Sequence, residues 1–336
     1  GIKMVSPVFL IAASLGYAFL YPLIERIGRV FAVRLSLFVV AAFVAVIGGW
    51  TADLIAGAAP LVSQTAGFVA PLSIRLQVGL MEGIVLSAIS LIALAALAQS
   101  TLRKNDPWDG KRIVLFFVMI LGAFGLVMTR DLFNVFVFLE ISGISLFGLL
   151  STSKDGRVFE AGFKYMVASG LASVFFLIGV AFVYRTVGSL AIADIAAAAP
   201  LLSAPMGVLG LLFLVTGLLI ELKPAPANGW AIDTYQAADP GIGALISAVN
   251  ASAVAVVLIR VVPILAGAAE ELFLPLLLGA GTVAFVLPQI QALRQESFTR
   301  LLGYSSVAQI GLVVLAVAAH PGDVSLWIVS VSVPVL

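Results

Sequence analysis

The stretch MGVLGLLFLVTGLLIELKPAPANGW, residues 206–230, joins an apolar run long enough to cross a bilayer to an abrupt break. A proline removes a backbone donor and clashes with the preceding turn, so an α-helix cannot continue through Pro224 and Pro226. Broken helices occur at membrane depth only where they are buried in protein or line a hydrated cavity. The stretch therefore predicts a discontinuous transmembrane helix near 221–230. The alternative is an ordinary loop at the membrane surface.

The composition of the whole chain is that of a membrane protein. Its 336 residues are 62% hydrophobic and 10% charged, with a mean hydropathy of +1.18, whereas soluble domains carry about 25% charged residues. A net charge of +1 predicts no nucleic-acid partner. Because the chain has no cysteine and one histidine, His320, we expect no zinc–thiolate site, iron–sulfur cluster or paired-histidine haem. The sequence thus predicts neither a cofactor nor a metal.

Apolar runs of about 20 residues, the length that crosses roughly 30 Å of hydrocarbon, recur along the chain. They predict an all-α integral membrane protein with about eleven spans. The last begins near 323 and is still apolar at Leu336, so we expect the sequence to be a piece of a longer chain. The connections 51–77 and 186–205 are interpreted as external loops with a short interfacial helix. The complete candidate spans lie near 5–24, 30–50, 78–100, 113–130, 132–151, 161–184, 206–222, 241–262, 272–290 and 303–319.

Basic residues favour one orientation in the membrane. Cytoplasmic loops carry an excess of Lys and Arg, and the loops after the first, third, fifth and ninth spans are richer in both than the opposite side. This bias predicts that the N-terminus lies outside. The richer group is Arg26, Arg29, Arg34, Arg103, Lys104, Lys111, Arg112, Lys154, Arg157, Arg294 and Arg300, and the poorer group is Lys3, Arg75, Arg130, Arg185 and Arg260.

Two ionisable side chains lie within neighbouring predicted spans. A charge at mid-bilayer costs about 2.5–3.5 kcal/mol on insertion scales, so it persists where it faces protein or water and has a partner. Glu140 lies roughly 13 Å into a helix that starts at Asp131, near the membrane centre, and is a candidate proton site. Lys164, on the next antiparallel span, is the expected partner whose approach or withdrawal would shift the pKa of Glu140. The alternatives are a Glu140 permanently bonded for packing and a Lys164 whose ammonium reaches the interface.

Three further ionisable groups lie in or beside the spans. Glu221 and Lys223 flank the predicted helix break, where a coupled acid and base would carry a proton through the membrane. Glu82 is a weaker candidate because it is close enough to the outer surface to be merely interfacial. The sequence contains no phosphate-binding loop, which argues against transport driven directly by ATP.

Four motifs resemble the proton-conducting antiporter family. They are DLFNVFVFLE (131–140), AGFKY (161–165), GSLAIAD (188–194) and RLLGYSSVAQIG (300–311). That family comprises the antiporter-like membrane subunits of respiratory complex I, those of membrane-bound hydrogenases, and the large subunits of multisubunit sodium/proton antiporters. The resemblance runs from about residue 71 to 320.

The resemblance implies about fourteen helices with two inverted five-helix repeats, each containing one discontinuous helix. Residues 1–130 would form the N-terminal helices, 131–262 the first repeat with discontinuous helix seven, and 263–336 the start of the second repeat. Glu140 and Lys164 would be the family's fifth-helix glutamate and sixth-helix lysine. Trp230, Asp233 and Tyr235 would match a downstream pattern, and Arg260 would close helix eight.

Two positions depart from the family pattern. Glu221 stands where the family has its seventh-helix lysine, and Lys223 follows two residues later. The eighth-helix lysine falls near Ala251 or Ser252, with Asn250 the nearest strongly polar group.

The predicted function is that of a non-redox, proton-translocating subunit of a complex of the NADH:quinone oxidoreductase or hydrogenase type. Protonation of Glu140 would be coupled to Lys164 and to the Glu221/Lys223 pair. Its partners would be the lipid bilayer, other membrane subunits and protons, or sodium, in a bacterial or archaeal cytoplasmic membrane or an organellar inner membrane. The alternatives are the large subunit of a multisubunit Na⁺/H⁺ antiporter and a structural subunit without transport.

Overall fold

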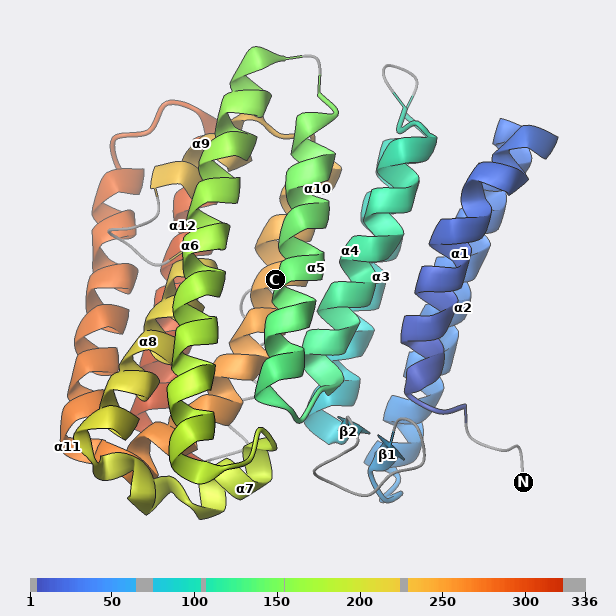
Figure 1. The fold of residues 1–336 in the computed structure, drawn as a ribbon. Coiled ribbons are helices and arrows are strands. Elements are labelled where there is room, and N and C mark those ends of the chain that lie inside the picture. Colours follow the sequence, from blue (N-terminus) through green and yellow to red (C-terminus); the bar gives the residue numbers. More distant parts are fainter. Residues whose placement is uncertain (1–4, 65–74, 104–106, 154, 224–228, 323–336) are drawn as a thin grey trace.

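The computed structural model describes residues 5–64, 75–103, 107–153, 155–223 and 229–322. Within these ranges nine helices are long and apolar enough to cross a membrane, and they lie roughly parallel to one another (Figure 1). The predicted all-α membrane fold is therefore confirmed, and the eleventh predicted span lies outside the described residues. The nine are α1 (Val8–Ile27), α2 (Arg29–Ile55), α3 (Leu80–Thr101), α4 (Gly110–Met128), α5 (Leu132–Ser151), α6 (Gly156–Val187), α8 (Pro205–Leu222), the stretch Pro240–Ala292 and α12 (Phe298–Ala319).

The stretch Pro240–Ala292 contains two of the predicted spans. It begins with α10 (Pro240–Ala244), continues as the π-helical segment η3 (Leu245–Asn250) and ends with α11 (Ala251–Ala292). At about 1.5 Å per residue α11 is about 60 Å long, twice the hydrocarbon thickness. The chain leaves helical geometry at Ala269, with φ −158° and ψ 71°, so two helical arms meet there (Figure 1). These arms are the spans expected at 241–262 and 272–290.

The predicted helix break is bounded by two helices. α8 ends at Leu222, and Lys223 follows in the left-handed conformation with φ 60°. A short helix, α9 (Gly229–Ala237), then begins. The prolines lie in 224–228, outside the described residues, but the two helix ends confirm that the seventh span is discontinuous.

The two long connections differ from each other. Residues 186–205 contain α7 (Ile192–Ala197) and the 3₁₀ helix η2 (Ala199–Ser203), as the interpretation of a short helix expected. In contrast, the described part of 51–77 holds a hairpin of β1 (Leu61–Gln64) and β2 (Arg75–Val78). Residues 65–74 lie outside the described ranges, so the short helix expected in this connection stays a prediction. Leu76 of β2 also bridges to Thr129 before α5. Strands this short carry almost no periodic signal, which is why the sequence did not show them.

The connections rich in basic residues lie together at one end of the bundle. Arg29 donates to the Trp108 carbonyl (3.2 Å), and Arg112 donates to Thr152 (3.0 Å). The Arg103 guanidinium pairs with Asp239 at 2.7 Å. These bonds link the connection after α1 to those after α3 and α5. The excess of basic residues in these connections had predicted that they lie on the same side of the membrane.

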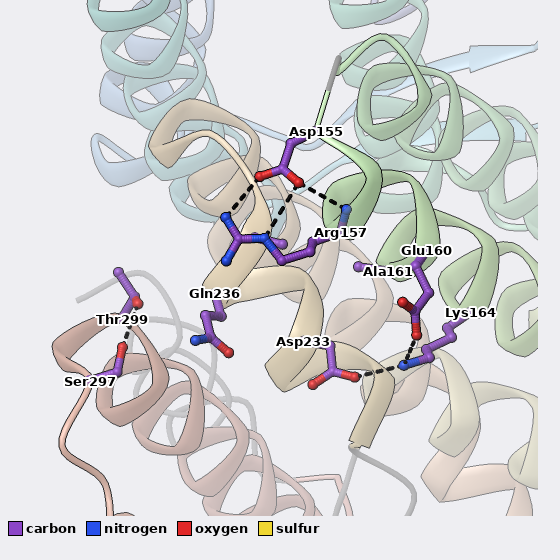
Figure 2. A pocket seen from close by; sticks show the side chains of 10 residues that line it. Asp155, Arg157, Glu160, Ala161, Lys164, Asp233, Gln236, Ser297 and Thr299 are labelled. Atoms are coloured by element: carbon purple, nitrogen blue, oxygen red, sulfur yellow. Dashed lines mark hydrogen bonds and ion pairs between the residues drawn. The ribbon is translucent and has the colours of Figure 1, made fainter.

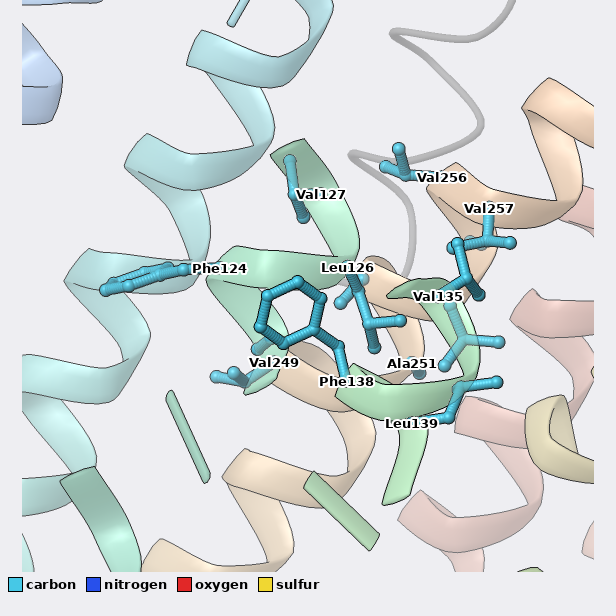
Figure 3. Packing of buried hydrophobic residues seen from close by; sticks show 14 of the residues in the cluster. Phe124, Leu126, Val127, Val135, Phe138, Leu139, Val249, Ala251, Val256 and Val257 are labelled. Atoms are coloured by element: carbon cyan, nitrogen blue, oxygen red, sulfur yellow. The ribbon is translucent and has the colours of Figure 1, made fainter. Parts of the chain in front are cut away.

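An apolar layer fills the space between α4, α5 and the first arm of α11. Leu126 from α4, Phe138 from α5 and Val257 from α11 are buried members of this layer (Figure 3). Gly125 admits the Phe138 ring, because a Cβ at this glycine would collide with the ring. The layer packs α4 against α5, which carries Glu140, and against α11, which carries Arg260.

Candidate functional site

Glu221 is buried at the end of α8, where the sequence predicts a break. Its side chain accepts a hydrogen bond from Ser169 Oγ (2.9 Å to Oε2) and another from Asn250 Nδ2 (3.2 Å to Oε1). The residue is only 3% exposed. Carboxylates at this depth need such donors because no water solvates them. α6 and the π-helical segment thus hold Glu221 between them.

Lys223 is completely buried beside Glu221. Its ammonium donates to the Ile246 carbonyl (3.1 Å) and lies 5.8 Å from the ring centroids of both Trp230 and Tyr235. A π-helical turn shifts the helical hydrogen-bond pattern and is frequent at functional sites, and aromatic faces attract cations. Since α8 has already ended, the Lys223 side chain enters the space between the break and the π-helical segment.

Small residues bring α8 against α6. A Cβ at Gly217 would lie 2.6 Å from the Ala172 carbonyl oxygen, and one at Gly179 would lie 2.6 Å from the Leu214 amide nitrogen. Membrane helices approach each other closely where glycine leaves no side chain between the two backbones. Gly217 lies one turn before Glu221, so this close approach sets Glu221 against Ser169.

Glu140 lies in the middle of α5 and is partly buried. About one turn later on α5, Gly143 faces Ser169 Oγ, the hydroxyl that donates to Glu221. Within the described ranges it has no ion pair and no hydrogen-bonded side chain. The structure therefore brings together two of the predicted acidic groups, Glu140 and Glu221, across α5, α6 and α8.

Lys164 does not contact Glu140 in the described structure, so its expected role as a partner that approaches and leaves Glu140 stays a prediction. Its ammonium binds Glu160 Oε1 (2.9 Å) and Asp233 Oδ2 (3.0 Å), and its side chain is 44% exposed. Lys164 lies about two turns from the start of α6, where its long stem reaches carboxylates at the helix end. Asp233 from α9 also faces Arg300 of α12, at 3.6 Å.

These charged groups line a cavity of about 410 Å³ at the end of the bundle that carries the basic connections. Figure 2 shows Lys164 reaching Glu160 and Asp233 across the cavity from α6 to α9. Hydrogen bonds from Arg157 lower the pKa of Asp155 at its rim. A second cavity, of about 450 Å³, lies on the other side of α9 and is lined by Tyr235, Ser247, Ser306 and Gln309 among others. The two cavities are lined in part by neighbouring residues of α9, the helix that follows the break.

A second buried charge cluster lies away from these cavities, and sequence reasoning missed it. Glu82 Oε1 binds Arg130 (2.7 Å) and Arg260 (2.9 Å), and its Oε2 accepts from the Gly79 amide (2.9 Å). Arg260 also donates to the carbonyls of Leu126, Val127 and Thr129 at the end of α4. Glu82 is 3% exposed and Arg260 6%, so both are buried inside the bundle. The available signals were Arg260, expected at the end of helix eight, and Glu82, near the start of the third predicted span, which lie far apart in the sequence.

Within the described ranges no group of three His, Asp or Glu side chains converges.

Comparison with known proteins agrees with this geometry. NADH-quinone oxidoreductase subunit N of Desulforudis audaxviator is 32% identical over 311 residues, which are 88% of this chain and 62% of the relative. A chain of the membrane-bound sulfane sulfur reductase, an archaeal respiratory membrane complex, superposes with a TM-score of 0.86 at 29% identity, over 93% of this chain and 64% of that one. The Mrp complex from Dietzia sp. DQ12-45-1b shares the fold, with a TM-score of 0.76 at 24% identity over 93% of this chain and 58% of its own.

The chain spans less than two thirds of the length of these relatives. The profile of the family described as NADH:quinone oxidoreductase/Mrp antiporter, transmembrane, matches residues 129–333. That segment contains Glu140, Glu221, the helix break and the cavity around Lys164. With this match, the chain belongs to the NADH:quinone oxidoreductase/Mrp antiporter transmembrane family.

Proposed function

We propose that this chain translocates protons as an antiporter-like membrane subunit of a redox-driven complex. The observation that carries the proposal is a carboxylate, Glu221, buried at a helix break beside a buried ammonium, Lys223. Intramembrane ionisable groups are functional by default because they are costly. Transport through this axis would occur with the N-terminus outside, in a bacterial or archaeal cytoplasmic membrane.

The charges on Glu140 and Lys223 can switch the proton affinity of Glu221. Two unit charges about 4 Å apart interact by about 4 kcal/mol at an effective dielectric of about 20, which is about a thousandfold in proton affinity. A proton on Glu221 removes its attraction to Lys223 and its repulsion of Glu140. Movement of Lys223 imposed by a partner subunit would therefore change how tightly Glu221 holds a proton.

In this proposal, protons enter from the end of the bundle where Lys164 and Asp233 lie. Their ion pair lies in a cavity open at the end of the bundle with the basic connections, which we assign to the cytoplasm. If the Lys164 ammonium moved from Asp233 to Glu140, it would stabilise the ionised form of Glu140. Glu140 would then release its proton. The exposed ion pair is weak enough for such an exchange, since pairs of this kind are worth about 0–1 kcal/mol.

The test is proton uptake by vesicles that contain the whole complex, driven by its electron donor. Glu140→Gln and Glu221→Gln should each lower uptake at least tenfold while the complex still assembles. Glu270→Gln, at an exposed carboxylate on α11, is the matched control. Wild-type uptake in both acidic-site variants would refute transport through this axis and leave a structural subunit. Exchange driven by a sodium gradient without an electron donor would instead identify the Na⁺/H⁺ antiporter alternative.

A further inference from the structure

Tyr165 is a buried tyrosine whose hydroxyl has no hydrogen-bond partner among the described residues. It lies on α6 with 0% exposure. A buried hydroxyl without a partner costs stability, whereas phenylalanine would fill the same space without that cost. The ring packs on Trp230, with centroids 5.2 Å apart, which is also a ring against which Lys223 lies. Packing therefore accounts for the ring and leaves the hydroxyl unexplained.

The hydroxyl lies on the side of α6 that faces α5, the helix that carries Glu140. Ser169, one turn further along the same face of α6, donates its own hydroxyl hydrogen to Glu221 Oε2 at 2.9 Å. The Tyr165 and Ser169 side chains thus occupy the route from α5 to α8.

A glycine on α5 makes room for both hydroxyls. A Cβ at Gly143 would lie 2.9 Å from Ser169 Oγ and 3.7 Å from Tyr165 Oη. Gly143 lies about one turn after Glu140 on the same helix. The α5 face that carries Glu140 is therefore open where the two hydroxyls meet it.

We propose that Tyr165 and Ser169 form a hydroxyl relay that passes protons between Glu140 and Glu221. The relay rests on the proposed function. In this relay the two hydroxyls carry the proton from Glu140 to Glu221. Lys164 does not connect these two acids, because its ammonium binds Glu160 and Asp233.

The step conserves every proton. The Glu140 carboxylic acid gives its proton to Tyr165 Oη as Tyr165 passes its own to Ser169 Oγ, and Ser169 passes its proton to Glu221 Oε2. Glu140 ends ionised and Glu221 neutral, and both hydroxyls keep one hydrogen. Rotation of the two hydroxyls restores the starting orientation for the next proton.

The first test is Tyr165→Phe in the whole complex. We expect assembly and melting temperature at or above those of the wild type, because only an unpartnered hydroxyl is lost, and proton uptake at least tenfold lower. Ser169→Ala should lower uptake in the same direction. Tyr184→Phe, at an exposed tyrosine on α6, and Ser173→Ala, one turn beyond Ser169, are the matched controls.

A second variant separates a relay from packing. 3,5-Difluorotyrosine at position 165 keeps the ring and the hydroxyl but makes the hydroxyl more acidic, so the pH profile of uptake should shift to lower pH. A purely structural hydroxyl would leave the profile unchanged.

The outcomes distinguish the relay from the proposed function. Normal uptake in Tyr165→Phe, with loss in Glu140→Gln and Glu221→Gln, overturns the relay and leaves the proposed function intact. Normal uptake in all three variants overturns both.

Discussion

Glu82→Gln tests whether the buried charge cluster at the far end from the cavities holds the bundle together. The substitution removes the only carboxylate bound to Arg130 and Arg260 in the described structure, at 2.7 and 2.9 Å. Breaking a buried pair by removing one partner costs about 3–5 kcal/mol, because the remaining charge is uncompensated. Here two guanidiniums are left, although Arg260 retains its bonds to α4 carbonyls. At about 2 °C per kcal/mol, a slope seen in larger domains, the melting temperature should fall by about 6–10 °C.

The assay is thermal unfolding of the purified complex in detergent, followed by tryptophan fluorescence. Glu270→Gln, at an exposed carboxylate on the same helix as Arg260, should leave the melting temperature unchanged. The double variant Glu82→Gln, Arg260→Met should regain part of the loss, because it removes the buried guanidinium together with its partner. A melting temperature within 1 °C of the wild type for Glu82→Gln alone would refute the reasoning.

Three other changes have defined outcomes. Gly217→Ala places a Cβ against the backbone of α6, so it should destabilise by about 1–3 kcal/mol and lower proton uptake, whereas Gly170→Ala, with open space around it, should do neither. Burial raises the pKa of Asp131 in the folded chain above its value in the unfolded chain. The free energy of unfolding therefore falls as the pH rises above ~3.9. Asp131→Asn, which can still cap α5, should therefore melt no lower than the wild type at pH 7, and the difference should vanish when melting is repeated near pH 4. Lys164→Met should change stability by less than about 1 kcal/mol, because its ion pairs are exposed, but should lower uptake in the vesicle assay.

The spans were predictable from the sequence because lipid imposes a simple rule on helix length and polarity. Pro224 and Pro226 likewise indicated the break, since each proline removes a backbone donor and clashes with the preceding turn. The hairpin Leu61–Gln64 with Arg75–Val78 was not predictable, because its stability depends on pairing within the hairpin and on Leu76 bridging to Thr129. Local sequence does not contain those contacts.

The residues of the site were predictable from the sequence, but the contacts between those residues were not. Burial cost alone identified Glu140, Glu221 and Lys223. The pairing of Lys164 with Asp233 depends on where α9 lies after the break, and helix depth could not give that position. The burial of Glu82 depends in the same way on Arg260, which is distant in sequence.

The two charged centres are insulated from each other along α11, and this favours sideways transfer between helices. Asn250, which binds Glu221, and Arg260, which binds Glu82, are about 15 Å apart along the helix. Apart from Ser252, residues 251–259 are Ala, Val, Leu and Ile, and they are buried. A proton on Glu221 therefore meets an apolar wall in the direction of Arg260, where an ion would lose its hydration. Besides Asn250 and Lys223, the polar side chains toward which a proton on Glu221 can move lie on α5 and α6, which is the direction that the hydroxyls of Tyr165 and Ser169 connect.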